Sequence, residues 1–486
     1  MVEAPVADLR VVVLGGGACG MTAALGLARG GAQVTVLERE PRVGGLCGTQ
    51  ERSGFRFDLG GHRFLSKSRA LEALVRDLVG DDLLCRTRSS VVIHGGRRFR
   101  YPLELDDVIR GAGPAWGARV IASYASERLR RRLAPRPDRS FEDWVVHRFG
   151  RELYGAFFGP YTEKLWGIPP SQISADWAAE RISLPSLTDL LARLVGLRSG
   201  DPPRTYARRY LYPRLGIGQI FERMGDAITA LGGTVRTSAL VTGISVAAGR
   251  ACAVRFDAGE GEREIGCDAV VATVALPLLA RMIGAGRRGG LPLDVHRSAS
   301  SLRFRGIRLL NVLLDRAEVS PHTWMYVSEP RFLAARIQEP RHRSPDAAPP
   351  GQTSLMLEIP CTVGDEVWSA PDDAIYDRCM DDLEQLGLRD LRAATLDHFP
   401  SFVVEGYPIY HLDYRRDRAR VLDFASALPN LVTCGRQGGF RYIFMDTAME
   451  MGLAAASALL GRLRSSTVIA DLGAGEGFIE ARALTA

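Results

Sequence analysis

A glycine-rich turn near the amino terminus constrains this chain more than any other feature of its sequence. The β-branched run Val11–Val13 precedes three glycines at G-x-G-x-x-G spacing, and an Ala/Leu-rich segment follows them. The glycines are Gly15, Gly17 and Gly20. Such a turn uses glycine to bend sharply, to let backbone N–H groups approach a pyrophosphate, and to pack a helix on a strand. The sequence therefore predicts a strand, a tight turn and a helix whose amino-terminal end binds a dinucleotide.

An acidic residue follows where a dinucleotide site would need one. The predicted strand Gln33–Leu37 is followed by Glu38, eighteen residues after Gly20. A carboxylate at this point accepts hydrogen bonds from ribose hydroxyls and favours an adenosine ribose without a phosphate. For the motif taken alone, a glycine-rich loop with no ligand is the alternative interpretation.

A second glycine turn comes shortly after the acid and carries a family resemblance. Arg42, Gly44 and Gly45 form an R-x-G-G pattern, and Asp58-Leu59-Gly60-Gly61-His62 follows. With Glu38, these residues resemble the FAD-dependent superfamily of amine oxidases, protoporphyrinogen oxidases, phytoene desaturases and UDP-galactopyranose mutases. The resemblance implies FAD as the cofactor, with the acid and R-x-G-G around its diphosphate. It also implies an α/β fold: a Rossmann-type, glutathione reductase-like FAD domain assembled from separated segments, a β-sheet substrate domain and an inserted helical lobe.

Within that superfamily, the middle of the chain is most similar to the UDP-galactopyranose mutases. Tyr161-Thr-Glu-Lys164-Leu-Trp166, followed by Arg181, resembles their substrate-lobe motif, and Arg336-Ile-Gln-Glu339 resembles the strand that carries a second arginine. The resemblance implies that Arg181 and Arg336 hold the diphosphate of a nucleotide sugar, because arginine binds phosphate with paired hydrogen bonds. It places His62 beside the flavin, so these three are the candidate catalytic residues. The implied reaction interconverts pyranose and furanose rings with reduced flavin and no net redox change.

Further residues are implied as contacts of the cofactor and of the small-molecule substrate. Gly435-Arg436, with Arg441, Tyr442 and Met445-Asp446, resembles the turn and helix start that hold the isoalloxazine. The candidate cofactor-binding residues are Gly15, Gly17, Gly20, Glu38, Arg42, Gly44, Gly45, Gly60, Gly61, Val241, Gly435, Arg436, Met445 and Asp446. The candidate substrate-binding residues are Phe157, Tyr161, Trp166, Tyr407 and Tyr442. Aromatic faces of this kind can stack on a nucleobase and exclude water.

Other interpretations stay open for these residues. Trp166 and Tyr161 are also typical of the core of a helical lobe, and Tyr407 of a strand edge. The second functional hypothesis is an FAD-dependent oxidoreductase of the protoporphyrinogen or amine oxidase type that oxidises a C–N or C–C bond, including one in natural-product biosynthesis. A flavin-binding protein without catalysis is the third. Leu65-Ser66 stands where bacterial mutases place a second histidine, so the sugar and the nucleobase stay open.

Composition excludes several other classes of protein. The chain has 486 residues and a formal net charge of +6, which implies no nucleic-acid partner. Its eight cysteines form no C-x-x-C pair and no metal-ligand spacing with histidine, so we expect reduced, buried thiols and no metal site. There is no signal-peptide stretch and no apolar run near ~20 residues, so we expect a cytoplasmic protein without a transmembrane segment. The sequence does not define an oligomeric state.

Two further features concern partners. No second dinucleotide motif is evident, so we expect the flavin to be reduced by NAD(P)H in the substrate cleft or by a separate reductase. The densest basic run contains Arg128, Arg130, Arg131, Arg132, Arg136 and Arg139. It is typical of a solvated helix end and loop, with an anionic partner or a membrane surface as the alternative.

Changes of character along the chain predict its division into domains. We expect FAD-binding segments at 8–103, 206–298 and 411–466, a helical substrate lobe at 104–205, a β-rich substrate domain at 299–410 and a carboxyl-terminal tail at 467–486. The FAD domain would then be assembled from three separated pieces.

Overall fold

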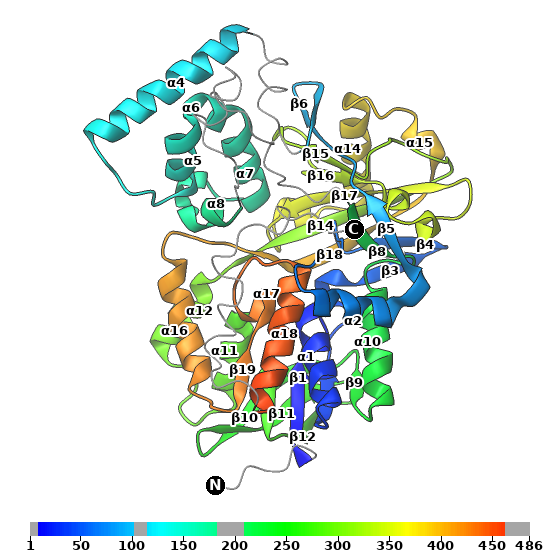
Figure 1. Cartoon of the computed structure of the whole chain (residues 1–486), viewed down its shortest axis with the longest axis vertical. Coiled ribbons are helices and arrows are strands. Elements are labelled where there is room, and N and C mark those ends of the chain that lie inside the picture. The colour runs from blue at the N-terminus through cyan, green and yellow to red at the C-terminus, as the bar shows by residue number, and fades with distance from the viewer. Residues whose placement is uncertain (1–7, 102–113, 182–208, 462–486) are drawn as a thin grey trace.

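A parallel sheet forms one end of the molecule in the computed structural model, which describes residues 8–101, 114–181 and 209–461 (Figure 1). Its five strands run in the order β19-β13-β1-β2-β9, and every neighbouring pair is parallel. The strands are β1 (Arg10–Leu14), β2 (Gln33–Leu37), β9 (Thr234–Arg236), β13 (Ala269–Ala272) and β19 (Leu431–Thr433). Because they come from three separated parts of the chain, the sheet is complete only when the carboxyl-terminal strand joins it.

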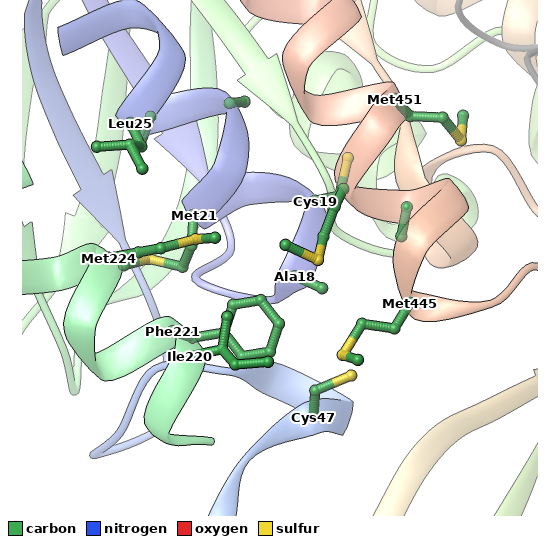
Figure 2. Packing of buried hydrophobic residues seen from close by; sticks show 14 of the residues in the cluster. Ala18, Cys19, Met21, Leu25, Cys47, Ile220, Phe221, Met224, Met445 and Met451 are labelled. Atoms are coloured by element: carbon green, nitrogen blue, oxygen red, sulfur yellow. The ribbon is translucent and has the colours of Figure 1, made fainter. Parts of the chain in front are cut away.

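Hydrophobic cores cover both faces of this sheet. Val11 and Val13 belong to one core and Val12 and Leu14 to another, because successive strand side chains point to opposite faces. The first core contains side chains of α1 (Ala18–Arg29), α10 (Gln219–Ala230) and α18 (Met445–Leu459), which meet in Figure 2, and α2 (Arg69–Val79) adds to it. The second lies among α11 (Leu276–Ala285), α12 (Leu293–Ser301), α16 (Tyr414–Ser426) and an antiparallel sheet of β10 (Leu240–Ala247), β11 (Arg250–Asp257) and β12 (Glu262–Gly266).

A seven-stranded mixed sheet has the order β18-β14-β17-β16-β15-β6-β7. Its strands are β6 (Ser90–His94), β7 (Arg97–Arg100), β14 (Phe304–Leu314), β15 (Trp324–Val327), β16 (Arg336–Gln338), β17 (Thr353–Cys361) and β18 (Thr395–Pro408). β15 pairs in parallel with β6, so the β6–β7 hairpin joins this sheet although it comes from the amino-terminal part of the chain. α14 (Asp372–Gln385) packs on one face, next to the short α13 (Glu366–Ser369) and α15 (Leu391–Ala394).

A helical lobe covers the other face of the seven-stranded sheet (Figure 1). It consists of α4 (Pro114–Leu133), α5 (Phe141–Phe149), α6 (Arg151–Leu153), the π-helical turn η4 (Tyr154–Phe158), α7 (Gly159–Trp166) and α8 (Ala175–Arg181). α5 begins with a capping box: the Ser140 hydroxyl accepts from the Asp143 N–H, and the Asp143 carboxylate accepts from the Ser140 N–H. Such a box provides acceptors for two backbone N–H groups that have no hydrogen-bond partner within the helix.

Short elements connect these layers. β3 (Thr49–Arg52) pairs with β4 (Phe55–Asp58), and β5 (Leu83–Thr87) with β8 (Arg209–Pro213), both antiparallel. Single helical turns lie at η2 (Gly45–Cys47), η3 (Gly80–Asp82), η5 (Pro170–Gln172), η6 (Pro340–His342), η7 (Pro345–Ala347) and α17 (Gly435–Gly438).

The predicted α/β fold class, with a parallel sheet and covering helices, is confirmed. The sequence also predicts a mostly helical stretch from Arg69 to Leu84, which is too long. α2 ends at Val79, because Gly80 takes a φ of +62° and the chain then enters β5. Part of the predicted helical substrate lobe at 104–205 and the predicted tail at 467–486 lie outside the described residues.

Candidate functional site

A cavity of about 850 Å³ lies at the carboxyl ends of the parallel strands. Gly15, Glu38 and Thr273 each directly follow a strand of the sheet, and all three line the cavity. Gly435 lies two residues after β19 and lines it too. In α/β folds of this kind ligands bind beyond the carboxyl ends of the strands. The cavity therefore lies where the fold itself predicts a ligand.

Most of the candidate residues line this one cavity. They are Gly15, Gly17, Glu38, Arg42, Gly44, Gly45, Gly60, Gly61, His62, Tyr161, Val241, Arg336, Tyr407, Gly435, Arg436, Tyr442, Met445 and Asp446. They come from the parallel sheet, from the helical lobe and from the seven-stranded sheet, so the cavity is shared between these parts of the molecule.

The two glycine turns lie against each other. Gly17 forms a parallel bridge with Gly44, and the Gly44 N–H donates to the carbonyl of Gly16 at 2.8 Å. Gly15 and Gly44 have φ values of +98° and +108°, which side chains rarely allow. An added Cβ on Gly17 would meet no atom closer than 3.8 Å, so this glycine leaves open space above the helix start. The two turns thus form an uncrowded backbone cradle of the kind that a dinucleotide diphosphate occupies.

Glu38 is fixed by the backbone around it. Its carboxylate accepts from the N–H groups of Gly16 at 2.6 Å and Glu40 at 2.8 Å. The side chain is buried, and this burial raises its pKa despite the two hydrogen bonds. Since each carboxylate oxygen has two lone pairs, both can still accept from a ribose.

A buried ion pair anchors the strand end from which the Gly60-Gly61-His62 loop begins. The Asp58 carboxylate lies 3.0 Å from the guanidinium of Arg343, and neither side chain is exposed. Asp58 also accepts from the hydroxyls of Tyr212 at 2.6 Å and Thr49 at 2.8 Å. These partners satisfy the buried charge and hold the end of β4, from which the loop enters the cavity.

His62 and Asp446 each bring an unpaired polar atom to the cavity. Among the described residues, His62 Nδ1 and Asp446 Oδ1 are buried and accept or donate no hydrogen bond. Burial, and then Arg436, Arg343 and Arg336, lower the pKa of His62 to about 3, so its imidazole is neutral. Burial raises the pKa of Asp446 to about 7. Two orphaned polar atoms in one cavity point to a ligand with hydrogen-bonding groups, and a flavin with its ribityl chain fits that requirement.

Arg436 supports the turn beside them. Its Nε donates to the carbonyl of Ile443 at 3.0 Å, and its guanidinium lies 4.6 Å from the ring centre of Tyr442. The Arg436 side chain therefore links the beginning of the segment between β19 and α18 to its end. Met445 and Asp446, which follow this segment, line the cavity.

Arg336 is held by an acidic partner on the neighbouring strand. Its Nε donates to Glu358 at 2.9 Å, and its Nη2 donates to the same oxygen. Burial opposes the charge on Arg336, but Glu358 and then Tyr407, Tyr326 and Tyr161 raise the pKa of the guanidinium well above its ordinary value. The cavity therefore holds a permanently charged and well-oriented arginine.

Tyrosines surround this arginine. Tyr161, Tyr326 and Tyr407 line the cavity, and Tyr101 stacks on Tyr326 with ring centres 4.5 Å apart. Burial would raise the pKa of Tyr326, but Arg88, Arg336 and Arg63 together lower it below its ordinary value. A buried phenol with a lowered pKa reports positive electrostatic potential around its hydroxyl.

Three of the candidate residues do not line the cavity, and the side-chain position of a fourth, Arg181, is not described. An added Cβ on Gly20 would lie 1.9 Å from the Gly15 carbonyl, so this glycine serves helix–turn packing. Phe157 lies among His94, Phe99 and Trp116. Trp166 is buried behind the wall, against Trp177, Tyr407 and Tyr442. Arg181 ends α8, and its side chain lies outside the described residues.

The sequence interpretation missed several residues of the wall. Trp177, Tyr101, Tyr326, Arg63 and Glu358 all line the cavity. Tyr101 and Tyr326 belong to no motif. They meet because β6 pairs on one side with β15, which carries Tyr326, and on the other side with β7, which Tyr101 follows. Glu358 lies opposite Arg336 in the β16–β17 register, a relationship that only the sheet pairing could reveal.

A parallel sheet with two facing glycine turns, an acid and a deep cavity at its strand ends defines a protein that binds FAD. The chain belongs to the family described as flavin containing amine oxidoreductase, whose model matches residues 18–460. The predicted FAD cofactor is thus confirmed. Among the described residues, no helix has the length and apolar character needed to cross a membrane.

Similar proteins fall into two groups. The fold is similar to that of reduced UDP-galactopyranose mutase, with a TM-score of 0.79 and 20% identity over 96% of this chain and 98% of the other. By sequence, the phytoene dehydrogenase of Streptomyces griseus is 26% identical over 396 residues, which are 72% of this chain and 73% of that protein. A limonene dehydrogenase subunit of Castellaniella defragrans is 29% identical over 259 residues, 49% of this chain and 43% of that protein. The chain therefore spans less than half of that last relative.

Proposed function

We propose that the protein is an FAD-dependent enzyme that interconverts the pyranose and furanose forms of a nucleotide-linked sugar, with no net redox change. The observation that carries this proposal is the cationic and phenolic wall of the cavity, formed by Arg336, Tyr161, Tyr326 and Tyr407. Guanidinium and hydroxyl groups suit a ligand that carries phosphate and many hydroxyls. A polyene offers these groups nothing to bind.

The orientation of Arg336 supports the binding of an anion. Glu358 occupies Nε and Nη2. Nη1 faces the glycine loop, where an added Cβ on Gly61 would lie 3.1 Å from it. This nitrogen is therefore the one that would meet a substrate next to the loop. A fixed guanidinium stabilises the charge of a departing nucleotide without reorganising first.

The positive potential extends beyond Arg336. The lowered pKa of Tyr326 reflects Arg88 and Arg63 as well, and Arg63 itself lines the cavity. Burial, with Arg88 beside it, lowers the pKa of Arg63 to about 10, a value at which it is still charged at neutral pH. A diphosphate entering this region would be attracted by all three arginines.

The remaining side chains bind, orient and exclude water. Bound FAD in its reduced form would supply a nucleophilic nitrogen for the anomeric carbon of the sugar. Neutral His62 can donate or accept a hydrogen bond beside it, and Asp446 can accept one. The buried Trp166 contacts the rings of Trp177, Tyr407 and Tyr442 in edge-to-face or tilted arrangements. These rings close the wall of the cavity behind the sugar.

A second candidate function is the oxidation of a C–N or C–C bond by hydride transfer to the flavin. The observation that favours it is an apolar strip of the cavity wall formed by Ile307, Phe399 and Val403. The names of the two relatives above are those of dehydrogenases. An apolar substrate would lie along this strip and leave the arginines unused.

Anaerobic turnover distinguishes the two functions. Holoenzyme reduced with dithionite is incubated with uridine, thymidine and guanosine diphosphate sugars, and ring forms are separated by chromatography. We expect ring interconversion with one of them, and a loss of about 10- to 100-fold in kcat/KM in Arg336→Met, as removal of a charged hydrogen bond predicts. Arg331→Met, in the exposed loop before β16, is the matched control. Peroxide formation from an amine or polyene, with no effect of any nucleotide sugar, would overturn the proposal.

A further inference from the structure

The outward face of α4 carries an exposed apolar stripe between Ala118 and Leu133. Ala118, Ile121, Ala125, Leu129 and Leu133 are all exposed and follow one another at spacings of three or four residues, which places them on one face of the helix. The exposed fractions of Ile121, Leu129 and Leu133 are 46%, 58% and 78%. Three of the large exposed apolar side chains of the described structure thus share one stripe, about 18 Å long between Ile121 and Leu133.

The opposite face of α4 explains why this stripe points outward. Val120, Tyr124 and Glu127 are buried and follow the same spacing, and α4 packs with this face on α5 and α6. α4 lies at the outer end of the helical lobe, away from the parallel sheet (Figure 1). The apolar stripe therefore lies on the surface, because the opposite side of α4 is the one that packs against the rest of the helical lobe.

Arginines surround the stripe. α4 contains Arg119, Arg128, Arg130, Arg131 and Arg132, and all but Arg131 are exposed. The acidic residue of α4 is Glu127, which is turned inward with 8% of its surface exposed. Arg119, Arg130 and Arg131 form ion pairs with Glu152, Glu127 and Asp138 at 3.7, 3.8 and 3.5 Å. Since α4 itself contains five arginines and one acidic residue, the helix combines exposed apolar side chains with an excess of positive charge.

We infer that this face of α4 docks the protein on an anionic membrane surface, with the helix lying in the plane of the headgroups. An interfacial helix of this kind buries its apolar stripe at the boundary of the acyl chains and places arginines among anionic headgroups. A nucleic acid or an acidic protein would use the arginines but would leave Ile121, Leu129 and Leu133 exposed to water. The inference goes beyond the proposed function and does not depend on it.

Vesicle sedimentation with the full-length holoenzyme tests the inference. We expect the protein to sediment with vesicles of phosphatidylglycerol and phosphatidylcholine, and to remain in solution with pure phosphatidylcholine vesicles or at high salt. Arg130→Gln combined with Arg132→Gln should weaken binding about 30-fold, at roughly 1 kcal/mol for each arginine near the surface. Leu129→Glu combined with Leu133→Glu should abolish it.

Matched variants elsewhere on the surface make the result specific. Leu231→Glu with Leu293→Glu changes leucines that are 51% and 65% exposed at the end of α10 and on α12, and Arg287→Gln with Arg288→Gln removes two charges from another exposed turn. Both pairs should bind vesicles as the unaltered protein does, and flavin absorbance checks that every variant is folded. Binding to heparin but not to anionic vesicles, or unchanged binding in the Leu129 and Leu133 variant, would overturn the inference.

Discussion

The carboxylate of Asp58 and the guanidinium of Arg343 lie 3.0 Å apart with no solvent exposure on either side chain. Arg343 also donates to Gln338 at 2.7 Å, which in turn accepts from the Trp324 indole at 3.0 Å. The pair thus ties β4, which carries the glycine loop, to the strand that carries Arg336. Two segments far apart in the sequence are fixed relative to each other by one buried ion pair.

Removing one member of this pair should be far more harmful than removing both. Arg343→Met leaves the Asp58 carboxylate buried without its partner, for which we expect a loss of about 3 to 5 kcal/mol in the free energy of unfolding. Asp58→Asn combined with Arg343→Met should lose less, because no charge is left buried. Urea denaturation of the two variants measures the difference. Equal losses would show that the ion pair is not the source of the stability.

Gly20 should be indispensable for flavin binding although it does not touch the cavity. Alanine at this position would bring its Cβ to 1.9 Å from the Gly15 carbonyl, so the turn that receives the diphosphate must move. We expect Gly20→Ala to purify without flavin absorbance or not to fold. Gly225→Ala in α10, where the nearest atom to an added Cβ is 3.6 Å away, should keep its flavin and gain slightly in helix propensity. A yellow Gly20→Ala protein would contradict the assigned packing.

Asp446 should make the apoprotein less stable at high pH. Its folded pKa of about 7 lies above the ordinary value of 3.8, so between these values the folded chain keeps a proton that the unfolded chain has released. The contribution of Asp446 to stability therefore falls as the pH rises through this range and is least favourable above it. Asp446→Asn should be the more stable apoprotein at pH 8, by up to about 4 kcal/mol, and the difference should vanish near pH 4. Thermal melts of both apoproteins across this range measure it, and a difference independent of pH would contradict the assignment.

Lys164 should position the substrate wall without touching substrate. Its Nζ donates to the carbonyls of Val327, Glu329 and Ala334 at 3.1, 3.1 and 2.7 Å. It thereby fastens α7, which carries Tyr161, to the loop that leads into β16 and Arg336. Lys164→Met should raise KM more than it lowers kcat and should retain the flavin, while Lys164→Arg should restore part of the affinity. Steady-state kinetics separate these effects, and an unchanged KM would show that the contact has no role in positioning.

The parts of the fold that were predictable depend on local pattern. Val11–Val13 and the glycines after them specify a strand, a turn and a helix within a few residues of one another, and the structure has all three. The membership of β6 and β7 in the seven-stranded sheet was not predictable, because it depends on the parallel pairing of Ser90–His94 with Trp324–Val327. Neither segment alone contains a pattern that identifies the strand with which it pairs.

The residues of the candidate site can also be separated into those that local sequence predicts and those that depend on tertiary packing. Gly44, Gly60 and Asp446 lie in turns and helix starts whose shape is set locally, and they line the cavity. Phe157 and Trp166 do not, because helical spacing shows that residues share a face but not which neighbour the face meets. The pairing of Arg336 with Glu358 follows from strand register, which no spacing within one segment encodes.

The number of sugar rings converted for each electron pair supplied decides whether the enzyme is a mutase or an oxidoreductase. Holoenzyme is reduced anaerobically with one equivalent of dithionite, nucleotide sugar is added in excess, and flavin absorbance and ring form are followed together. We expect many turnovers while the flavin stays reduced, because a reaction with no net redox change returns the electrons to the flavin in every cycle. A flavin that reoxidises once for each product molecule formed, or that stays reduced while the sugar is unchanged, would contradict it.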